Sequence, residues 1–245
     1  MTITDLPAPE THEIEPLLEL RGVHAAYDGI DVLHGVDLVV RPGRVVAVLG
    51  PNGAGKTTML KVLSGLHPAS SGDILVAGRR VNGARADDLA RRGLCLIPEG
   101  RGIFPNLTVR ENLWMMTHRG QTKAAVEEQA AARFPQLTKF MDQTAGTLSG
   151  GQQQMLAMAR GLATDPALLI LDELSMGLAP IIVDQLYETV GQVAAEGTSI
   201  LLVEQFARIV MDVADEAAVM VQGRIVETGR PRDLEASLSQ AYLGG

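Results

Sequence analysis

The feature that most constrains this chain is a glycine-rich segment between an apolar run and a helical stretch. Residues 50–57 read Gly-Pro-Asn-Gly-Ala-Gly-Lys-Thr and match the P-loop pattern G-x-x-x-x-G-K-[ST]. Glycines let the backbone point several N–H groups at phosphate oxygens, and the following helix adds the positive end of its dipole. The alternative is a chance glycine turn, but such a turn would not require the strand that precedes this loop or the helix that follows it. The candidate phosphate-binding residues are Gly50, Pro51, Asn52, Gly53, Ala54, Gly55, Lys56, Thr57 and Thr58.

Short apolar runs alternate with helical stretches on both sides of this loop, which predicts an α/β domain with a largely parallel sheet. The expected strands are 17–27, 32–40, 44–49, 73–76, 168–171, 199–203, 217–221 and 224–227, the last two joined by a Gln222-Gly223 turn. The expected helices are 56–66, 108–118, 122–134, 150–163 and 180–195. Strand patterns are missing from about 98 to 163, so this segment is expected to be a helical subdomain inserted into the sheet domain.

Two acids end the apolar strand at 168–173, which reads Leu-Leu-Ile-Leu-Asp-Glu. In an open α/β sheet, a residue at the carboxyl end of a strand projects into the ligand crevice. Asp172 is then placed to hold Mg²⁺ through water, together with the Thr57 hydroxyl, and Glu173 to polarise an attacking water. A solvated acidic turn would explain the pair taken alone, but the P-loop favours the catalytic interpretation.

A second anion-binding helix end is predicted at residues 148–152, Leu-Ser-Gly-Gly-Gln. Ser149 is a natural N-cap, and the glycines after it leave the first N–H groups of the helix uncovered. A plain helix start accounts for a Ser-Gly pair but not for this pentapeptide. The candidate anion-binding residues are Ser149, Gly150, Gly151 and Gln152.

Composition excludes several classes of function. The net charge of −8 and the 3% aromatic content argue against a nucleic-acid partner. No apolar run approaches the roughly 20 residues that cross a bilayer, and the N-terminus shows no signal peptide. Residues 1–16 are acidic and are expected to be a flexible tail before a single domain at 17–245. A cluster of six arginines, at positions 79, 80, 85, 91, 92 and 101, is expected to be a solvated face or a contact toward lipid.

The P-loop, LSGGQ and LLILDE, in this order, resemble the nucleotide-binding subunits of ABC transporters, from about Leu18 onward. The resemblance implies a P-loop NTPase (RecA-like) sheet core with an antiparallel β subdomain and an inserted α-helical subdomain. It implies ATP and Mg²⁺ as cofactors and places Tyr27 against the adenine, although Tyr27 would also suit an ordinary strand. It further implies a head-to-tail dimer with a second ATPase subunit, whose ATP Ser149, Gly151 and Gln152 would cover.

Three positions depart from the usual family pattern. Glu99 stands where most relatives have a glutamine, and it is either a ligand of Mg²⁺ or of its water, or a loop acid paired with Arg101. Gln205 stands where most have a histidine that contacts the γ-phosphate, and glutamine donates a hydrogen bond but carries no charge. The loop at 174–180 lacks the usual proline and aspartate.

Together these variants resemble the ATPases of branched-chain (hydrophobic) amino acid uptake systems, in particular the second, LivF-type, of their two ATPase subunits. The implied partners are a related ATPase, two integral membrane permeases and, indirectly, an extracytoplasmic binding protein. The implied location is the cytoplasmic face of the cell membrane. The alternatives are a urea or short-amide importer, a soluble ABC protein without a permease, and a switch that binds ATP but scarcely hydrolyses it. Phe104, Leu107, Trp114, Met115 and Met116 are expected to form either a groove for a permease helix or the core of the helical subdomain.

Overall fold

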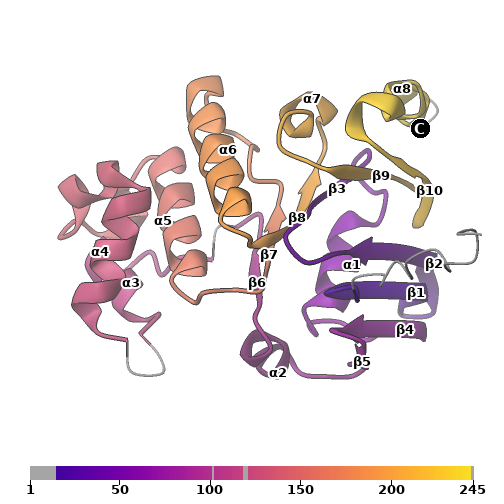
Figure 1. Cartoon of the computed structure of the whole chain (residues 1–245), viewed down its shortest axis with the longest axis horizontal. Helices are drawn as coiled ribbons and strands as arrows, with labels where there is room; N and C mark the ends of the chain where they lie inside the picture. The colour runs from indigo at the N-terminus through magenta and orange to yellow at the C-terminus, as the bar shows by residue number, and fades with distance from the viewer. Residues whose placement is uncertain (1–14, 101, 118–120, 244–245) are drawn as a thin grey trace, which may run out of the picture.

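The computed structural model describes residues 15–100, 102–117 and 121–243. A six-stranded sheet with the order β10-β9-β3-β8-β7-β6 forms its centre (Figure 1). The five strands from β9 to β6 pair in parallel, and β10 pairs with β9 in the antiparallel sense. Its members are β3 (Val45–Leu49), β6 (Leu94–Ile97), β7 (Leu168–Asp172), β8 (Ser199–Glu204), β9 (Glu216–Val221) and β10 (Arg224–Gly229).

A second, four-stranded sheet is antiparallel and has the order β2-β1-β4-β5. It consists of β1 (Leu18–Tyr27), β2 (Ile30–Val40), β4 (Ser71–Val76) and β5 (Arg79–Arg80). Helix α1 (Lys56–Leu63) packs between this sheet and one face of the parallel sheet. The two faces of β3 pack against different hydrophobic cores. Val46 and Val48 join the core with α1, whereas Val45, Ala47 and Leu49 join the core on the opposite face.

The helical segment lies between β6 and β7 in the chain and forms one end of the molecule (Figure 1). It contains α3 (Val109–Trp114), α4 (Lys123–Arg133), η1 (Pro135–Phe140), η2 (Ala145–Thr147) and α5 (Gly150–Leu162). Helices α2 (Ala86–Arg91), α6 (Pro180–Ala195), α7 (Ala207–Val210), η3 (Pro231–Leu234) and α8 (Glu235–Leu243) complete the structure. The predicted fold class is confirmed, including both the antiparallel sheet and the inserted helices.

The structure differs from the expected elements in several places. The helix expected over 56–66 ends at Leu63, because Gly65 has a φ of 70° and the N–H of Leu66 turns back to the carbonyl of Lys61. Strand β6 and helices α2 and α8 had no sequence prediction, and the helix expected over 108–118 is only Val109–Trp114. His118, Arg101 and most of the expected tail lie outside the described residues, so the domain boundaries stay predictions.

Candidate active site

The P-loop connects β3 to α1 and is shaped by glycines that allow close backbone contact. Gly50 lies so close to β9 that a Cβ atom there would meet the carbonyl oxygen of Met220 at 2.2 Å. Gly55 precedes α1 with a φ of 103°, a conformation that L side chains rarely adopt. The loop therefore needs glycine at these positions for its own conformation, besides any need of a ligand.

The turn between β9 and β10 supports the P-loop from outside the motif. Gln222 and Gly223 both have positive φ, 45° and 75°, as a tight two-residue hairpin turn requires. The N–H of Gly223 donates to the carbonyl of Ala54 at 2.7 Å, and the N–H of His34 donates to the carbonyl of Gly223 at 2.9 Å. The sequence predicted this turn but contained no signal that it would hold the P-loop.

Lys56 contacts both the P-loop and the acid pair that ends β7. Its ammonium group, only 4% exposed, donates to the carbonyls of Gly50 at 2.7 Å and Pro51 at 3.2 Å. The same nitrogen lies 3.5 Å from a carboxylate oxygen of Glu173. Strands β3, β8 and β7 are parallel neighbours, so the segments that follow them meet at one edge of the sheet.

Acidic groups gather at the same edge. A cleft of about 390 Å³ is lined by P-loop residues 52–58 together with Glu99 and Glu173. Asp172 is 6% exposed, and burial raises the pKa of its carboxyl group to about 6. The neighbouring charges of Glu173 and Glu99 contribute to this rise in pKa, and the charge of Lys56 opposes it. Crowded carboxylates of this kind are stabilised by a nearby cation.

These oxygen donors fit Mg²⁺ in the way that nucleotide sites usually bind it. No group of three or more His, Cys, Asp or Glu among the described residues is arranged to hold a metal alone. Mg²⁺ typically takes only one or two protein carboxylates and completes its shell with phosphate oxygens and water. Thr57, Asp172 and Glu99 match that requirement, and their assignment as metal ligands stays a prediction.

The turn that follows β7 carries Glu173 in a strained conformation. The φ of Glu173 is 46°, and its N–H donates to the carbonyl of Val203 in β8 at 2.8 Å. Two residues later, the N–H and the hydroxyl of Ser175 both donate to Glu204, at 3.1 and 2.9 Å. Sequence reasoning missed Glu204, because nothing in its local pattern sets it apart from a strand-ending acid.

Gln205 and Tyr27 are among the predicted site residues that do not line the P-loop cleft. Gln205 lines a neighbouring cleft of about 1020 Å³ that also includes Glu173, and the carbonyl of Gln205 accepts a hydrogen bond from the hydroxyl of Tyr242. Tyr27 stacks on His67, with ring centres 4.1 Å apart, and the ammonium of Lys61 lies 5.9 Å from its ring centre. One face of Tyr27 is therefore occupied within the chain, and its contact with adenine stays a prediction.

Residues Ser149, Gly150, Gly151 and Gln152 lie at the start of α5 and do not line the P-loop cleft of this chain. Ser149 and Gln152 form a capping box, in which the N–H of Ser149 donates to the amide oxygen of Gln152 at 2.9 Å. Gly151 is buried, and a Cβ atom there would meet Ile182 of α6 at 2.5 Å. The glycine thus permits close packing of two helices, which the sequence interpretation had not considered.

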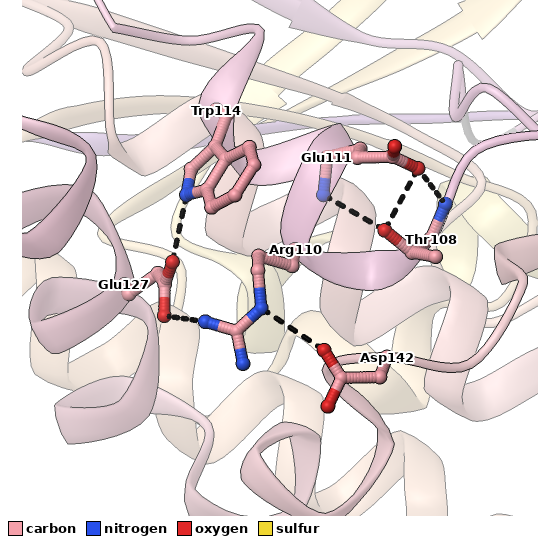
Figure 2. A network of polar contacts seen from close by, with 6 residues as sticks. All are labelled: Thr108, Arg110, Glu111, Trp114, Glu127 and Asp142. Carbon is pink, nitrogen blue, oxygen red and sulfur yellow. Dashed lines mark hydrogen bonds and ion pairs between the residues drawn. The ribbon is translucent and has the colours of Figure 1, made fainter.

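The apolar residues of the helical segment divide into two groups. Trp114 is tied to α4, because its indole N–H donates to Glu127 at 2.7 Å (Figure 2). The ammonium of Lys123 also lies 4.0 Å from its ring centre. Phe104 and Met115 are 43% and 56% exposed. Of the residues expected to form either a groove or a core, Met116 packs against the core and Trp114 is half-buried, whereas Phe104 and Met115 are exposed.

Three of the five arginines of the cluster that the structure describes form ion pairs on the surface. Arg80 pairs with Asp73, Arg85 with Asp87, and Arg91 with both Asp87 and Asp88. Exposed pairs of this kind contribute little to stability, about 0–1 kcal/mol each. This arrangement agrees with a solvated face.

Several known proteins are similar to this chain in sequence and in fold. The ABC transporter family model matches residues 33–175. The chain is 41% identical over 234 residues to the high-affinity branched-chain amino acid transport ATP-binding protein BraG of Pseudomonas aeruginosa, covering 94% of this chain and 100% of that protein. It is 33% identical to the probable branched-chain amino acid transport ATP-binding protein LivF of Archaeoglobus fulgidus, covering 86% and 91% of the two chains.

Among solved structures, a nucleotide-free ATP-binding cassette from an ABC transporter matches with a TM-score of 0.82 and 25% identity, over 94% of this chain and all of that one. Within the part of the chain that the structure describes, no helix is both long and apolar enough to cross a membrane. The matched family model, the two relatives and the geometry of the P-loop edge agree. The chain therefore belongs to the ABC transporter family, as one of its ATP-binding cassettes.

Proposed function

We propose that this chain binds ATP at its P-loop, hydrolyses it, and thereby drives uptake of branched-chain amino acids through a membrane importer. The observation that carries the proposal is the meeting of Lys56, Asp172 and Glu173 at one sheet edge, with the Lys56 ammonium 3.5 Å from the carboxylate of Glu173. A phosphate-binding lysine beside an acid that polarises water is the arrangement that phosphoryl transfer to water needs.

Each side chain then has a defined task. The N–H groups of the P-loop and the Lys56 ammonium bind the phosphates and stabilise the charge that develops on them. The Glu173 carboxylate accepts a hydrogen bond from the attacking water, and the Gln205 amide donates one to the γ-phosphate. Thr57, Asp172 and Glu99 hold Mg²⁺ directly or through water. Mg²⁺ held by these residues would supply positive charge that offsets the charge of the phosphates.

A second ATPase subunit completes the site. The start of α5 is capped and partly exposed at Ser149, and it contributes nothing to the P-loop cleft of its own chain. This supports a role of Ser149, Gly151 and Gln152 on the ATP of a partner, whose own residues would cover the ATP bound here. The partner is a related ATPase in a head-to-tail dimer.

The membrane partners are two permease subunits, with an extracytoplasmic binding protein that delivers the substrate to them. Phe104 and Met115, exposed on the helical segment, are suited to contact a permease helix, because aromatic and Met side chains adapt well to a helix laid against them. The chain would then reside on the cytoplasmic face of the membrane. Branched-chain amino acids are proposed as the cargo because BraG and LivF are named for their transport.

The test is uptake into proteoliposomes that contain this chain, a partner ATPase and the two permease subunits of the same importer. With ATP on the side of the ATPases and binding protein on the other, radiolabelled leucine is expected to accumulate. Glu173→Gln is the matched control and should abolish accumulation. Uptake of urea or acetamide in place of leucine would overturn the choice of cargo. ATP hydrolysis that is indifferent to permease and binding protein would overturn the importer itself.

A further inference from the structure

Glu204 is the last residue of β8 and stands between the two catalytic candidates, Glu173 and Gln205. Resting on the proposed ATPase function, we propose that Glu204 is a positioning residue. It fixes the Glu173 turn and the Gln205 segment relative to each other by accepting hydrogen bonds from Ser175 and Tyr187. Glu204 itself touches neither nucleotide nor water in this proposal. Its effect on hydrolysis passes through the two neighbouring segments.

The contacts of Glu204 are unusually complete for a buried acid. Its side chain is 1% exposed, and one carboxylate oxygen accepts from the hydroxyl of Tyr187 at 2.6 Å and from the N–H of Ser175 at 3.1 Å. The other oxygen accepts from the hydroxyl of Ser175 at 2.9 Å. Burial raises the pKa of Glu204, and these hydrogen bonds act in the opposite direction. A buried carboxylate is tolerated where donors of this kind replace the lost water.

These contacts fix the turn that bears Glu173. Adjacent residues of β8 hold two points of that turn, because the carbonyl of Val203 accepts from the N–H of Glu173 and the side chain of Glu204 accepts from Ser175. Glu173 has a strained φ of 46°, which persists only where its surroundings enforce it. The direction of the Glu173 carboxylate, 3.5 Å from Lys56, therefore depends on the Glu204 contacts.

Tyr187 supplies the third fixed point, from the middle of α6. Its ring is 5% exposed, and its hydroxyl is the only group of the side chain that can donate a hydrogen bond. The large cleft of about 1020 Å³ lies against this cluster and is lined by Glu173, Glu204 and Gln205. Ser175 and Met176 of the turn also line this cleft, so the turn borders open space on that side, and the hydrogen bonds to Glu204 fix it from the other.

The role of the Glu204 contacts can be tested with a variant that removes one hydrogen-bond donor and changes little else. Tyr187→Phe deletes the hydroxyl but keeps the ring in the core. Thr189→Val is the matched control, because Thr189 is also buried on α6 and its hydroxyl donates only to the carbonyl of Gln185 in the same helix, at 3.1 Å. Both variants are assembled with the partner ATPase and permeases. The measurements are kcat and KM for MgATP, affinity for ATP in the Glu173→Gln background, and the midpoint of thermal unfolding.

Tyr187→Phe is expected to lower kcat about tenfold while KM and ATP affinity change less than about twofold, since misplacement of a catalytic group by a fraction of an ångström lowers turnover more than binding. Ser175→Ala, which keeps its N–H, should lower kcat by a similar factor. The double variant should lose less than the product of the two, because both act through one carboxylate. Thr189→Val should stay within about twofold of the native sequence in both parameters.

A native kcat in Tyr187→Phe, or an equal loss in Thr189→Val, would overturn the positioning role and leave the cluster as a structural contact. A rise in KM with unchanged kcat would overturn it as well. These results differ from failure of the proposed function, which would appear as absence of ATP hydrolysis in the native assembly. In that case both proposals fall together.

Discussion

The P-loop and the turn that carries Glu173 face each other across one cleft but are held in different ways. Main-chain contacts hold the P-loop: Gly50 lies against the backbone of β9, and Ala54 accepts from the N–H of Gly223. The Glu173 turn has a main-chain bond to Val203 but also depends on a side chain, because Glu204 accepts hydrogen bonds from the hydroxyl groups of Ser175 and Tyr187. The site thus combines a cradle fixed by backbone geometry with an acid whose direction depends on a few replaceable side chains.

This difference bears on how variation acts. A side chain added at Gly50 strikes the backbone of β9, which cannot move away easily, whereas the loss of a hydroxyl around Glu173 removes a hydrogen bond and leaves the chain path intact. Damage to the first region should therefore appear in folding and in ATP binding. Damage to the second should appear in turnover.

The largest effect is expected for Gly50→Ala. Its Cβ atom would meet the Met220 carbonyl oxygen at 2.2 Å, so the backbone of β3 or β9 must shift, at a cost of about 3 kcal/mol or more. Gly53→Ala is the control, because Gly53 has a φ of 79° but no atom within 4 Å of its added Cβ, and strain alone costs about 1–2 kcal/mol. Urea unfolding of both nucleotide-free variants measures the difference. Equal destabilisation would contradict the packing argument.

Glu173→Gln should abolish turnover and leave folding and ATP binding in place. The amide keeps the shape of the side chain but no longer polarises the attacking water, so the ATP-bound dimer accumulates. Phosphate release and size-exclusion chromatography with MgATP measure the two effects. Unchanged phosphate release would remove Glu173 from the catalytic role.

Asp172→Asn should stabilise the fold at high pH while it abolishes ATPase activity. The folded-state pKa of Asp172, about 6, lies above the value of about 3.9 expected in the unfolded chain. The folded state therefore holds the proton more tightly, and its stability falls as pH rises from about 4 to 6. At pH 8, Asp172→Asn should raise the free energy of unfolding of the nucleotide-free chain by about 1–2 kcal/mol while ATPase activity is lost. At pH 4 the gain should vanish, and a gain independent of pH would refute the assignment.

The smallest effect is expected for Gln205→His. Both side chains donate a hydrogen bond to phosphate, so kcat should stay the same or rise by about threefold or less. Gln205→Ala removes the donor and serves as the comparison. A collapse of kcat in Gln205→His would show that glutamine makes a contact that histidine cannot replace.

The parts of the site fixed by backbone geometry were largely predictable from sequence. Lys56 and Glu173 lie together as expected, because strand-loop-helix order and parallel pairing place both at one sheet edge. The short strand β6 was missed, since four apolar residues before a proline give little periodicity. Glu204 and Tyr187 were missed for another reason. They lie 17 residues apart in sequence, on a strand and a helix, and only tertiary packing brings them together.

The tight contact between Gly151 of α5 and Ile182 of α6 has a mechanical consequence. Helix α5 belongs to the helical segment, and α6 begins seven residues beyond Glu173. A force that displaces α5 would therefore reach the start of α6, and from there pass through a short turn to Glu173. We therefore expect the rate of hydrolysis to depend on load, with resistance at the helical end changing how fast ATP is consumed while the nucleotide contacts stay the same.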